Sequence, residues 1–325
     1  MRSIILLGSV RDPELNAVAK NFRADDFVFI DETWLRTGRS MQLSLVDRDS
    51  NILQLDGQTV LLSEITGILC RPALGRQADG SIAESYFQEN TRIAEDYRRF
   101  DRDEAEALLL GALFPAKTRW VNHPAAEMVA NHKVHQLAEA QAVGLTIPRT
   151  FVSTDPVALK EFWCDNSGMV INKAVNSIST RSIRETLMTR RVSEAELDVL
   201  AESALSPTLF QELVPAELDL RVTLVGNSAF CCAIYSQEGE SPLDWRLDQT
   251  VKMTSYRMDD NLLIMLQQLK ERLGLAYGAV DLRITPDGTP VFLEINPRGV
   301  FSFAEYYTGD PITCAIAAFL SGEAV

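Results

Sequence analysis

Hydrophobic and polar residues alternate in short runs along the first third of the chain, and stretches of helical periodicity lie between these runs. Strand-like runs cover residues 3–7, 27–30, 43–46 and 65–70, and helical patterns cover residues 13–22 and 85–113. Alternating strands and helices are typical of an α/β domain. We therefore predict an N-terminal α/β domain over residues 1–118.

A second pattern begins near Trp120, after a chain segment that reads as a turn at Asn122-His123-Pro124. A helical pattern over residues 130–143 ends at Gly144, which suits the position after a helix terminus. Strand-like runs at residues 147–152 and 169–174 enclose a helix for which Asp155 is the predicted N-cap and Pro156 the first residue. We predict a central domain over residues 119–206.

The last third of the chain is mostly strand-like. The runs at residues 209–214, 220–225 and 229–236 are followed by a helical pattern at 261–273 and by the stretch DLRITPDGTPVFLEIN at 281–296. The turn residues Pro286-Asp287-Gly288 between two alternating runs predict a β-hairpin. We predict a C-terminal domain over residues 207–325 and a fold that combines α/β and α+β parts.

The predicted hairpin carries a set of oxygen ligands. Asp281 is expected to start its first strand, and Glu294 and Asn296 stand two apart near the end of its second strand. Side chains two apart share one face of a strand. Magnesium prefers such carboxylate and amide oxygens when it also holds nucleotide phosphates. The hairpin therefore predicts ATP-dependent chemistry, although the sequence contains no P-loop.

Two lysines and one extended segment upstream suit a nucleotide. Lys133 lies on a predicted helix and Lys173 ends the run MVINK, from which a lysine can reach a phosphate as a point charge. The segment Gln211-Glu212-Leu213-Val214 precedes a proline and can frame adenine through its backbone, while Glu212 accepts a hydrogen bond from a ribose hydroxyl. An edge-strand charge is the alternative interpretation of Glu212.

Two arginines are candidate catalytic residues. Arg221 shares a strand face with Asp219, and its guanidinium can hold a phosphoryl group or an acyl phosphate. A cross-strand ion pair is the alternative for Arg221. Arg246 follows Asp244-Trp245 in a loop, where a surface ion pair is the alternative.

Composition narrows the classes of protein that remain. A formal net charge of −14 argues against a general nucleic-acid binder. No apolar run is long enough to span a bilayer, and the start MRSIILLGSV is interpreted as a buried strand rather than a signal peptide. The five cysteines and three histidines lack zinc spacings and do not suggest a disulfide framework. We expect a cytoplasmic protein with mostly buried free thiols and no membrane partner.

The order of these motifs, from Lys133 and Lys173 through the segment at Glu212 and Arg221 to Glu294-Ile295-Asn296-Pro297, resembles the ATP-grasp ligases. Within that superfamily the chain is similar to the macrocyclases of microviridin-type ribosomal peptides, the graspetides. The narrower resemblance rests on the segments LCRP at 69–72, WVNHP at 120–124, NHK and QL at 131–137, GLTIPRT at 144–150, DWR at 244–246, LAYGAVD at 275–281 and EYYTG at 305–309.

The resemblance implies three domains with ATP between two α+β halves, and it implies roles for single residues. Lys133 and Lys173 would contact ATP phosphates, Gln211, Glu212, Leu213 and Val214 would frame adenine and ribose, and Asp281, Glu294 and Asn296 would hold Mg²⁺. Arg221 and Arg246 would bind the γ-phosphate and the acyl-phosphate oxygens.

Two departures from the superfamily stand out. The segment 174–180 has no glycine where many relatives have a glycine-rich loop, although the hydroxyls of Ser177, Ser179 and Thr180 can donate to phosphates. Arg298 precedes Gly299, after which relatives often carry a glutamine, so Arg298 is a candidate for reading the substrate differently.

The predicted function is ATP-dependent closure of ester or amide rings in a precursor peptide, through acyl phosphates on its Asp or Glu side chains. The resemblance implies a precursor with a helical leader segment and a core, and a homodimeric enzyme. An intermolecular ligase that adds an amino acid to a protein or a small molecule is one alternative. A non-catalytic ATP-binding or peptide-binding module is the other.

Overall fold

A computed structural model describes residues 4–31, 40–47, 50–55, 58–71, 91–173, 190–201, 207–241, 243–245 and 250–323 of the chain. The chain forms two compact units, one from Met1–His123 with Thr313–Val325 and the other from Pro124–Ile312. The last residues of the chain therefore belong to the first unit, which no sequence pattern indicated. The division into three domains stays a prediction.

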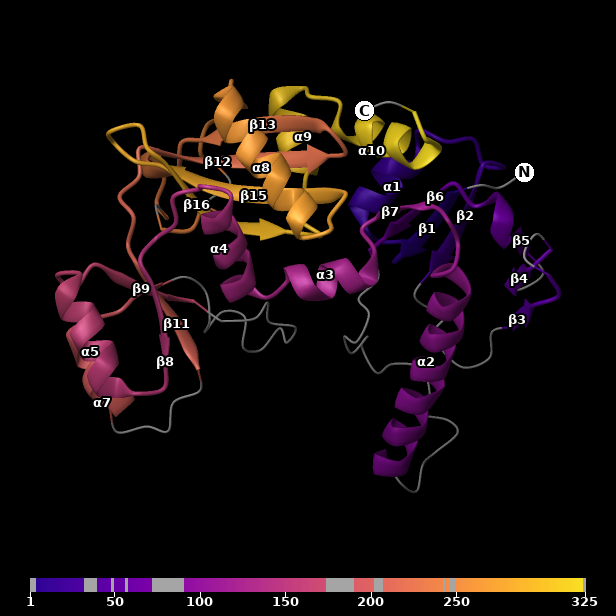
Figure 1. The fold of residues 1–325 in the computed structure, drawn as a ribbon, viewed down its shortest axis with the longest axis horizontal. Helices are drawn as coiled ribbons and strands as arrows, with labels where there is room; N and C mark the ends of the chain where they lie inside the picture. The colour runs from indigo at the N-terminus through magenta and orange to yellow at the C-terminus, as the bar shows by residue number, and fades with distance from the viewer. Residues whose placement is uncertain are drawn as a thin grey trace. The chain divides into compact units, whose positions relative to one another are not determined.

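The first unit contains a parallel sheet of four strands in the order β2-β1-β6-β7 and an antiparallel sheet in the order β3-β4-β5 (Figure 1). Its elements are β1 (Ile4–Gly8), α1 (Pro13–Ala19), β2 (Phe27–Asp31), β3 (Met41–Ser44), β4 (Ile52–Leu55), β5 (Gln58–Leu61), β6 (Gly67–Cys70), α2 (Thr91–Leu113), β7 (Arg119–Val121) and α10 (Ile312–Ser321). The predicted α/β pattern is confirmed for the parallel sheet. The antiparallel strands β4 and β5 were not predicted.

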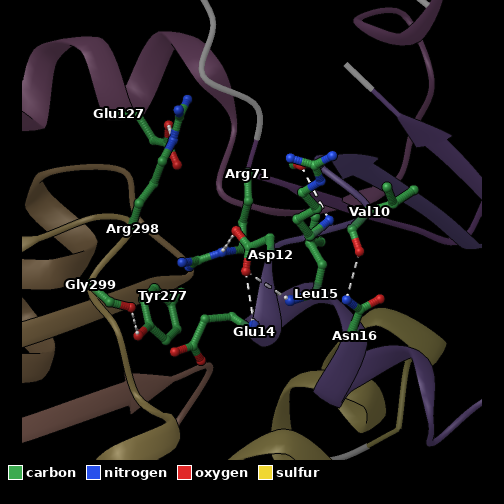
Figure 2. A network of polar contacts seen from close by, with 12 residues as sticks. Val10, Asp12, Glu14, Leu15, Asn16, Arg71, Glu127, Tyr277, Arg298 and Gly299 are labelled. Atoms are coloured by element: carbon green, nitrogen blue, oxygen red, sulfur yellow. Dashed lines mark hydrogen bonds and ion pairs between the residues drawn. The ribbon is translucent and has the colours of Figure 1, made fainter. Parts of the chain in front are cut away.

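The sequence of the first unit explains its core. All five residues of β1 are buried, as expected for a parallel strand covered on both faces. Asp12 caps α1, because its Oδ1 accepts hydrogen bonds from the backbone N–H groups of Glu14 and Leu15, and Pro13 takes the first helical position. Arg71, after β6, donates from Nε to Asp12 Oδ2 at 3.1 Å (Figure 2).

The second unit contains two antiparallel sheets, a larger one in the order β14-β13-β12-β15-β16 and a smaller one in the order β10-β9-β11-β8 (Figure 1). Its elements are α3 (Pro124–Ala130), α4 (Lys133–Ala142), β8 (Thr150–Ser153), α5 (Pro156–Asp165), β9 (Val170–Lys173), β10 (Arg190–Arg191), α7 (Glu194–Ala201), β11 (Thr208–Glu212), β12 (Leu218–Val225), β13 (Ser228–Ile234), β14 (Met253–Ser255), α8 (Asp260–Arg272), β15 (Tyr277–Ile284), β16 (Pro290–Asn296) and α9 (Ser302–Thr308).

Helices α4 and α8 cover one face of the larger sheet, and the two layers share a core. Alternate residues of β12, such as Leu220 and Val222, pack there with Leu266 of α8 and Leu137 of α4. The residues between them on β12 point to the opposite face, which leaves that face for polar side chains. The smaller sheet has its own core, in which Phe210 of β11 packs with Leu159 of α5.

The helix predicted for residues 130–143 is shorter in the structure and is preceded by another helix. The chain forms α3 from Pro124, breaks at Asn131 and His132, and resumes as α4 at Lys133. His132 is the N-cap with an extended backbone conformation. The Asn-His-Pro signal, interpreted as a turn, instead introduces a helix, because proline suits the first helical position. The predicted end is confirmed, since Gly144 has φ of +90° after α4.

The structure also bears on the expectations about the cysteines and about membrane-spanning segments. All five cysteines are free, and Cys70, Cys231 and Cys232 among them are buried. Within the described ranges, no helix is long and apolar enough to cross a membrane.

Candidate active site

The predicted hairpin is confirmed as β15 and β16, the last two strands of the larger sheet. Around the turn the backbone N–H of Thr285 donates to Thr289 O at 3.0 Å, and Gly288 adopts φ of +83°, which favours glycine. Asp281 lies opposite Glu294 in the register. The expectation that Asp281 starts its strand is wrong, because β15 already begins at Tyr277 and places Asp281 in its middle.

A β-bulge decides which side chains of β16 face the core. Leu282 pairs with Phe292 and Asp281 pairs with Glu294, so Leu293 is the extra residue on β16. Phe292 and Ile295 are therefore both buried in the core although they are three positions apart. Glu294 and Asn296 turn to the opposite face, as predicted, since the bulge lies before them.

The three predicted metal ligands are close together. Asn296 Nδ2 donates to Asp281 Oδ2 at 3.2 Å and to Glu294 Oε1 at 3.3 Å. No group of three or more His, Cys, Asp or Glu side chains suited to a metal occurs in the described part of the chain. The hairpin set offers two carboxylates and an amide, which suits Mg²⁺ because that ion keeps phosphate and water ligands beside one or two carboxylates.

Two cations neutralise the carboxylates of the hairpin. Lys133 Nζ lies 3.1 Å from Glu294 Oε2, and Arg221 Nη1 lies 2.7 Å from Asp281 Oδ1. Lys133 is the first residue of α4, whereas Arg221 is the neighbour of Asp281 across β12 and β15. The structure thus brings Lys133 and Arg221, which the sequence had marked separately, to the three predicted metal ligands. Lys133 contacts a carboxylate of the hairpin, and its predicted contact with ATP phosphates stays a prediction.

Arg221 is buried and its surroundings fix it. Its Nη2 donates to Val300 O at 3.2 Å, and its guanidinium lies 5.8 Å from the ring centre of Phe303. Burial opposes the charge of Arg221, but Asp281 and its other neighbours outweigh that effect and raise the pKa of the guanidinium. The cross-strand ion pair that was the alternative interpretation of Arg221 is therefore present.

Gly299 allows this close packing. A Cβ atom there would lie 2.3 Å from Ala279 Cβ and 3.1 Å from Arg221 Nη2. The Tyr277 hydroxyl donates to Gly299 O at 2.7 Å (Figure 2). A side chain at this position would push the segment after β16 away from Arg221.

The predicted adenine and ribose segment lies at the end of β11. Glu212 Oε1 accepts a hydrogen bond from the backbone N–H of Arg149 at 3.0 Å, and the backbone N–H of Leu213 donates to Met169 O at 2.8 Å. Gln211 is buried and donates from Nε2 to Thr150 Oγ1 at 3.0 Å. The edge-strand interpretation of Glu212 is wrong, because β11 lies between β9 and β8.

A buried ion pair holds the other end of this segment. Val214 O accepts from Arg283 Nη1 at 3.3 Å, and Arg283 also donates to both oxygens of Asp219, at 2.8 and 3.2 Å. Asp219 and Arg283 face each other on β12 and β15. The bidentate pair therefore anchors the predicted nucleotide segment to the larger sheet.

Of the remaining residues predicted to contact phosphate groups, the structure describes only Lys173. Lys173 is the last residue of β9 and is half-buried. Arg246, Ser177, Ser179 and Thr180 lie outside the described residues. Trp245, next to Arg246, packs its ring against Phe303 with centres 5.1 Å apart.

Arg298 forms an ion pair rather than standing alone beside the metal ligands. Its Nε lies 2.5 Å from Glu127 Oε2, and the Glu127 side chain is buried on α3 (Figure 2). The pair therefore ties the turn after β16 to α3. The prediction that Arg298 reads the substrate stays a prediction.

Sequence reasoning missed Gln136 and Arg283 as parts of the site. Gln136 exchanges hydrogen bonds with the backbone of Ile295, between two of the predicted metal ligands. Arg283 alternates with Asp281 along the hairpin strand, and this period-two spacing from a predicted ligand was the one signal that could have found it.

The cysteines near the site are poor nucleophiles. Burial raises the pKa of Cys231 to about 12 and that of Cys232 to about 11. Thiolates are the reactive form, so both thiols stay protonated near neutral pH. The arrangement suits the binding of a cation with a polyphosphate and offers no cysteine for covalent catalysis.

Solved structures of peptide-modifying enzymes are similar to the whole chain. The macrocyclase MdnC from Microcystis aeruginosa MRC, bound with the precursor peptide MdnA, matches with a TM-score of 0.80 and 27% identity over 99% of this chain and 100% of that chain. A RiPP-associated ATP-grasp ligase from Chryseobacterium gregarium, in complex with ADP and a leader and core peptide, matches with a TM-score of 0.82 and 22% identity over 100% and 98% of the two chains.

A third solved structure adds magnesium to the comparison. The ATP-grasp ligase PsnB, complexed with a phosphomimetic variant of its minimal precursor, Mg and ADP, matches with a TM-score of 0.76 and 22% identity over 99% of this chain and 98% of that chain. No family model matches the sequence. A search of curated proteins gave no match either. The likenesses confirm the predicted ATP-grasp fold and the resemblance to graspetide macrocyclases.

Proposed function

We propose that this chain, an ATP-grasp ligase in fold, closes rings in a ribosomal precursor peptide at the expense of ATP. One observation carries the proposal. Asp281, Glu294 and Asn296 meet on one face of the hairpin beside Lys133 and Arg221, in a chain that matches a macrocyclase over its full length. A module without catalytic activity would not require two carboxylates and an amide that are balanced by two cations.

The residues of the hairpin fit a magnesium ion. Asp281 and Glu294 would supply carboxylate oxygens, and rotation of the Asn296 amide would replace its donor nitrogen with an oxygen ligand. Bound Mg²⁺ would neutralise phosphate charge on ATP. Lys133, released from Glu294, would reach a phosphate oxygen as a point charge.

We assign the nucleotide base and ribose to the segment Gln211, Glu212, Leu213 and Val214. Its shape is set by backbone hydrogen bonds to Arg149 and Met169 and by the bond from Arg283 to Val214. The second carboxylate oxygen of Glu212 would accept from a ribose hydroxyl while the first keeps its bond to Arg149. Lys173, at the end of β9, is assigned to the phosphates.

The reaction would proceed in two displacements. A peptide carboxylate attacks the γ-phosphorus of ATP, so an O–P bond forms while the bond to the ADP oxygen breaks. A hydroxyl or an amine of the same peptide then attacks the acyl carbon, loses its proton and displaces phosphate. Arg221 would offset the charge that develops next to Asp281, and Arg246 is assigned to the acyl-phosphate oxygens. Each ring removes one water from the peptide.

The test uses the purified enzyme, ATP, Mg²⁺ and a candidate precursor peptide, chosen from any short reading frame beside its gene that encodes repeated Thr and Asp or Glu residues. We expect ADP and phosphate release together with the loss of one water mass per ring, measured by mass spectrometry. ATP turnover without a mass change would overturn the proposal. A mass gain would instead favour the intermolecular ligase, and the lack of both turnover and mass change would favour the non-catalytic module.

Further expectations accompany the proposal. The homodimer and the cytoplasmic location stay predictions, as does the expectation that neither nucleic acid nor a membrane is a partner. Sedimentation of the purified protein at several concentrations would test the homodimer.

A further inference from the structure

Strand β16 is the edge of the larger sheet, so its outward backbone groups need partners from outside the sheet. The segment after α4 covers its first half, where the N–H of Phe292 donates to Thr146 O at 2.8 Å and Thr146 forms a parallel bridge with Val291. The second half carries Glu294 and Asn296. A different partner holds it.

That partner is the side-chain amide of Gln136 on α4. Its Oε1 accepts from the backbone N–H of Ile295 at 3.1 Å, and its Nε2 donates to Ile295 O at 2.9 Å. The same Nε2 donates to Ala130 O, at the end of α3, at 2.5 Å. Gln136 is only 3% exposed and Ile295 is fully buried. One side chain thus replaces a neighbouring strand and also fixes the break between α3 and α4.

The position of this contact matters for the proposed metal site. Ile295 stands between Glu294 and Asn296, and Lys133 lies one helical turn before Gln136. Two links therefore join α4 to β16. The Lys133–Glu294 ion pair is part of the binding chemistry and must rearrange when phosphates arrive, whereas the buried Gln136 link can stay in place.

We infer that Gln136 is a positioning residue that holds Glu294, Asn296 and Lys133 in the register that Mg²⁺ and phosphate need. The inference rests on the proposed function. Only a side-chain amide of this length offers a donor and an acceptor side by side, as a strand backbone does. Methionine has a similar length and offers no N–H or C=O group. Gln136→Met would therefore leave both backbone groups of Ile295 buried without partners.

The experiment measures ADP binding by calorimetry in the presence of Mg²⁺ and again with excess EDTA. For Gln136→Met we expect the Kd of ADP with Mg²⁺ to rise by about tenfold or more, the effect typical of losing a residue that orients metal ligands. The Kd in EDTA should change by less than about twofold, because the adenine segment is not touched. Gln141→Met, at an exposed position of the same helix, is the matched control.

Hydrogen exchange supplies a readout that does not depend on ligands. The backbone amide of Ile295 should exchange faster in Gln136→Met than in the wild-type protein, while that of Phe292 keeps its protection by Thr146. If Gln136→Met does not fold, Gln136→Asn serves instead, since it keeps an amide and loses the reach of one methylene group.

The ADP-binding results distinguish a failure of the proposed function from a failure of the positioning role of Gln136. Wild-type protein that binds ADP no better with Mg²⁺ than with EDTA would contradict the proposed function. Wild-type protein with a clear Mg²⁺ effect, which the Gln136 variant retains in full, would overturn the positioning role. Equal weakening with and without Mg²⁺ would also overturn it, because the loss would then be a general structural defect.

Discussion

The two ends of the candidate site hold their polar groups in different ways. At the hairpin end, Asp281 and Glu294 are each paired with a cation and bridged by Asn296. At the other end, the segment from Gln211 to Val214 is held mainly by hydrogen bonds to backbone groups of Arg149 and Met169. The hairpin end is balanced by charge, whereas the segment end is shaped by backbone geometry.

This difference shows where ligand binding requires rearrangement. A cation and phosphates arriving at the hairpin would have to replace internal partners, including the bonds of Lys133 and Asn296. The base and ribose would meet a segment whose shape is already fixed. Substitutions at the first end should therefore affect turnover and Mg²⁺-dependent nucleotide binding. Substitutions at the second end should affect nucleotide affinity with or without Mg²⁺.

The largest effect is expected from Glu294→Gln, which removes one carboxylate from the hairpin and leaves its volume unchanged. Turnover should fall by about a thousandfold, because the site loses a negative ligand and Lys133 loses its partner. The measurement is ADP release with the precursor peptide, alongside circular dichroism to show that the fold persists. The exposed Glu217→Gln is the matched control, and activity equal to that control would refute the metal assignment.

The next largest effect is expected for the Asp219–Arg283 ion pair, which joins the segment from Gln211 to Val214 to the larger sheet. Asp219→Asn leaves Arg283 buried without its carboxylate, which should lower the free energy of unfolding by about 3–5 kcal/mol in urea titrations.

A double variant separates the charge from the packing at this position. Replacing both partners, with Asp219→Leu and Arg283→Met, should recover most of that stability, because an apolar pair leaves no buried charge. The Kd of ADP should rise in the double variant, since Arg283→Met removes the donor to Val214 O. A loss below about 1 kcal/mol for Asp219→Asn would show that the pair does not anchor the segment.

A smaller effect is expected for Glu212→Gln. The glutamine oxygen can still accept from the backbone N–H of Arg149, so the local structure should persist. Loss of the charged acceptor for ribose should raise the KM for ATP by about tenfold and leave kcat nearly unchanged. Steady-state kinetics with varied ATP would measure this split. A fall in kcat with an unchanged KM would mean that Glu212 acts in the chemical step rather than in ATP binding. The proposed difference between the hairpin end and the segment end would then be wrong.

The smallest effect lies at the turn of the hairpin, far along the strands from the metal ligands. Hydrogen bonds from the Thr285 hydroxyl and from Thr289 lower the pKa of the exposed Asp287. Because the folded pKa is below the unfolded one, the stabilisation is present above the ordinary aspartate pKa and is lost as pH falls through the folded value. Carboxyl titration by NMR should show the pKa of Asp287 rising in Thr285→Val, and an unchanged pKa would contradict the assignment.

Local features of the hairpin were predictable because neighbouring residues decide them. The turn at Pro286-Asp287-Gly288 and the common face of Glu294 and Asn296 depend on residues a few positions apart. The cap of α5 by Asp155 is equally local, since its Oδ1 accepts from the N–H of Val157. The bulge at Leu293 was not predictable, because strict period two would have put Phe292 on the same face as Glu294.

The missed parts of the site depend on residues distant in the sequence. Gln136 and Ile295 are 159 positions apart, and Asp219 and Arg283 are 64 apart. No spacing rule joins such pairs, since strand order and helix packing bring them together. The resemblance to ATP-grasp ligases indicated the chemistry of Lys133 and Glu294, but their direct contact appears only when α4 lies against β16.

The sequence by itself determined which residue types could carry ATP chemistry and which short elements would hold them, because side-chain chemistry, turn preference and period-two alternation are properties of the local chain. Tertiary structure alone decided that Arg221 is paired with Asp281, that β11 is an internal strand and that Gln136 completes the edge of β16. These facts follow from buried polar groups needing partners, and those partners are supplied by whichever distant segment the packing brings near.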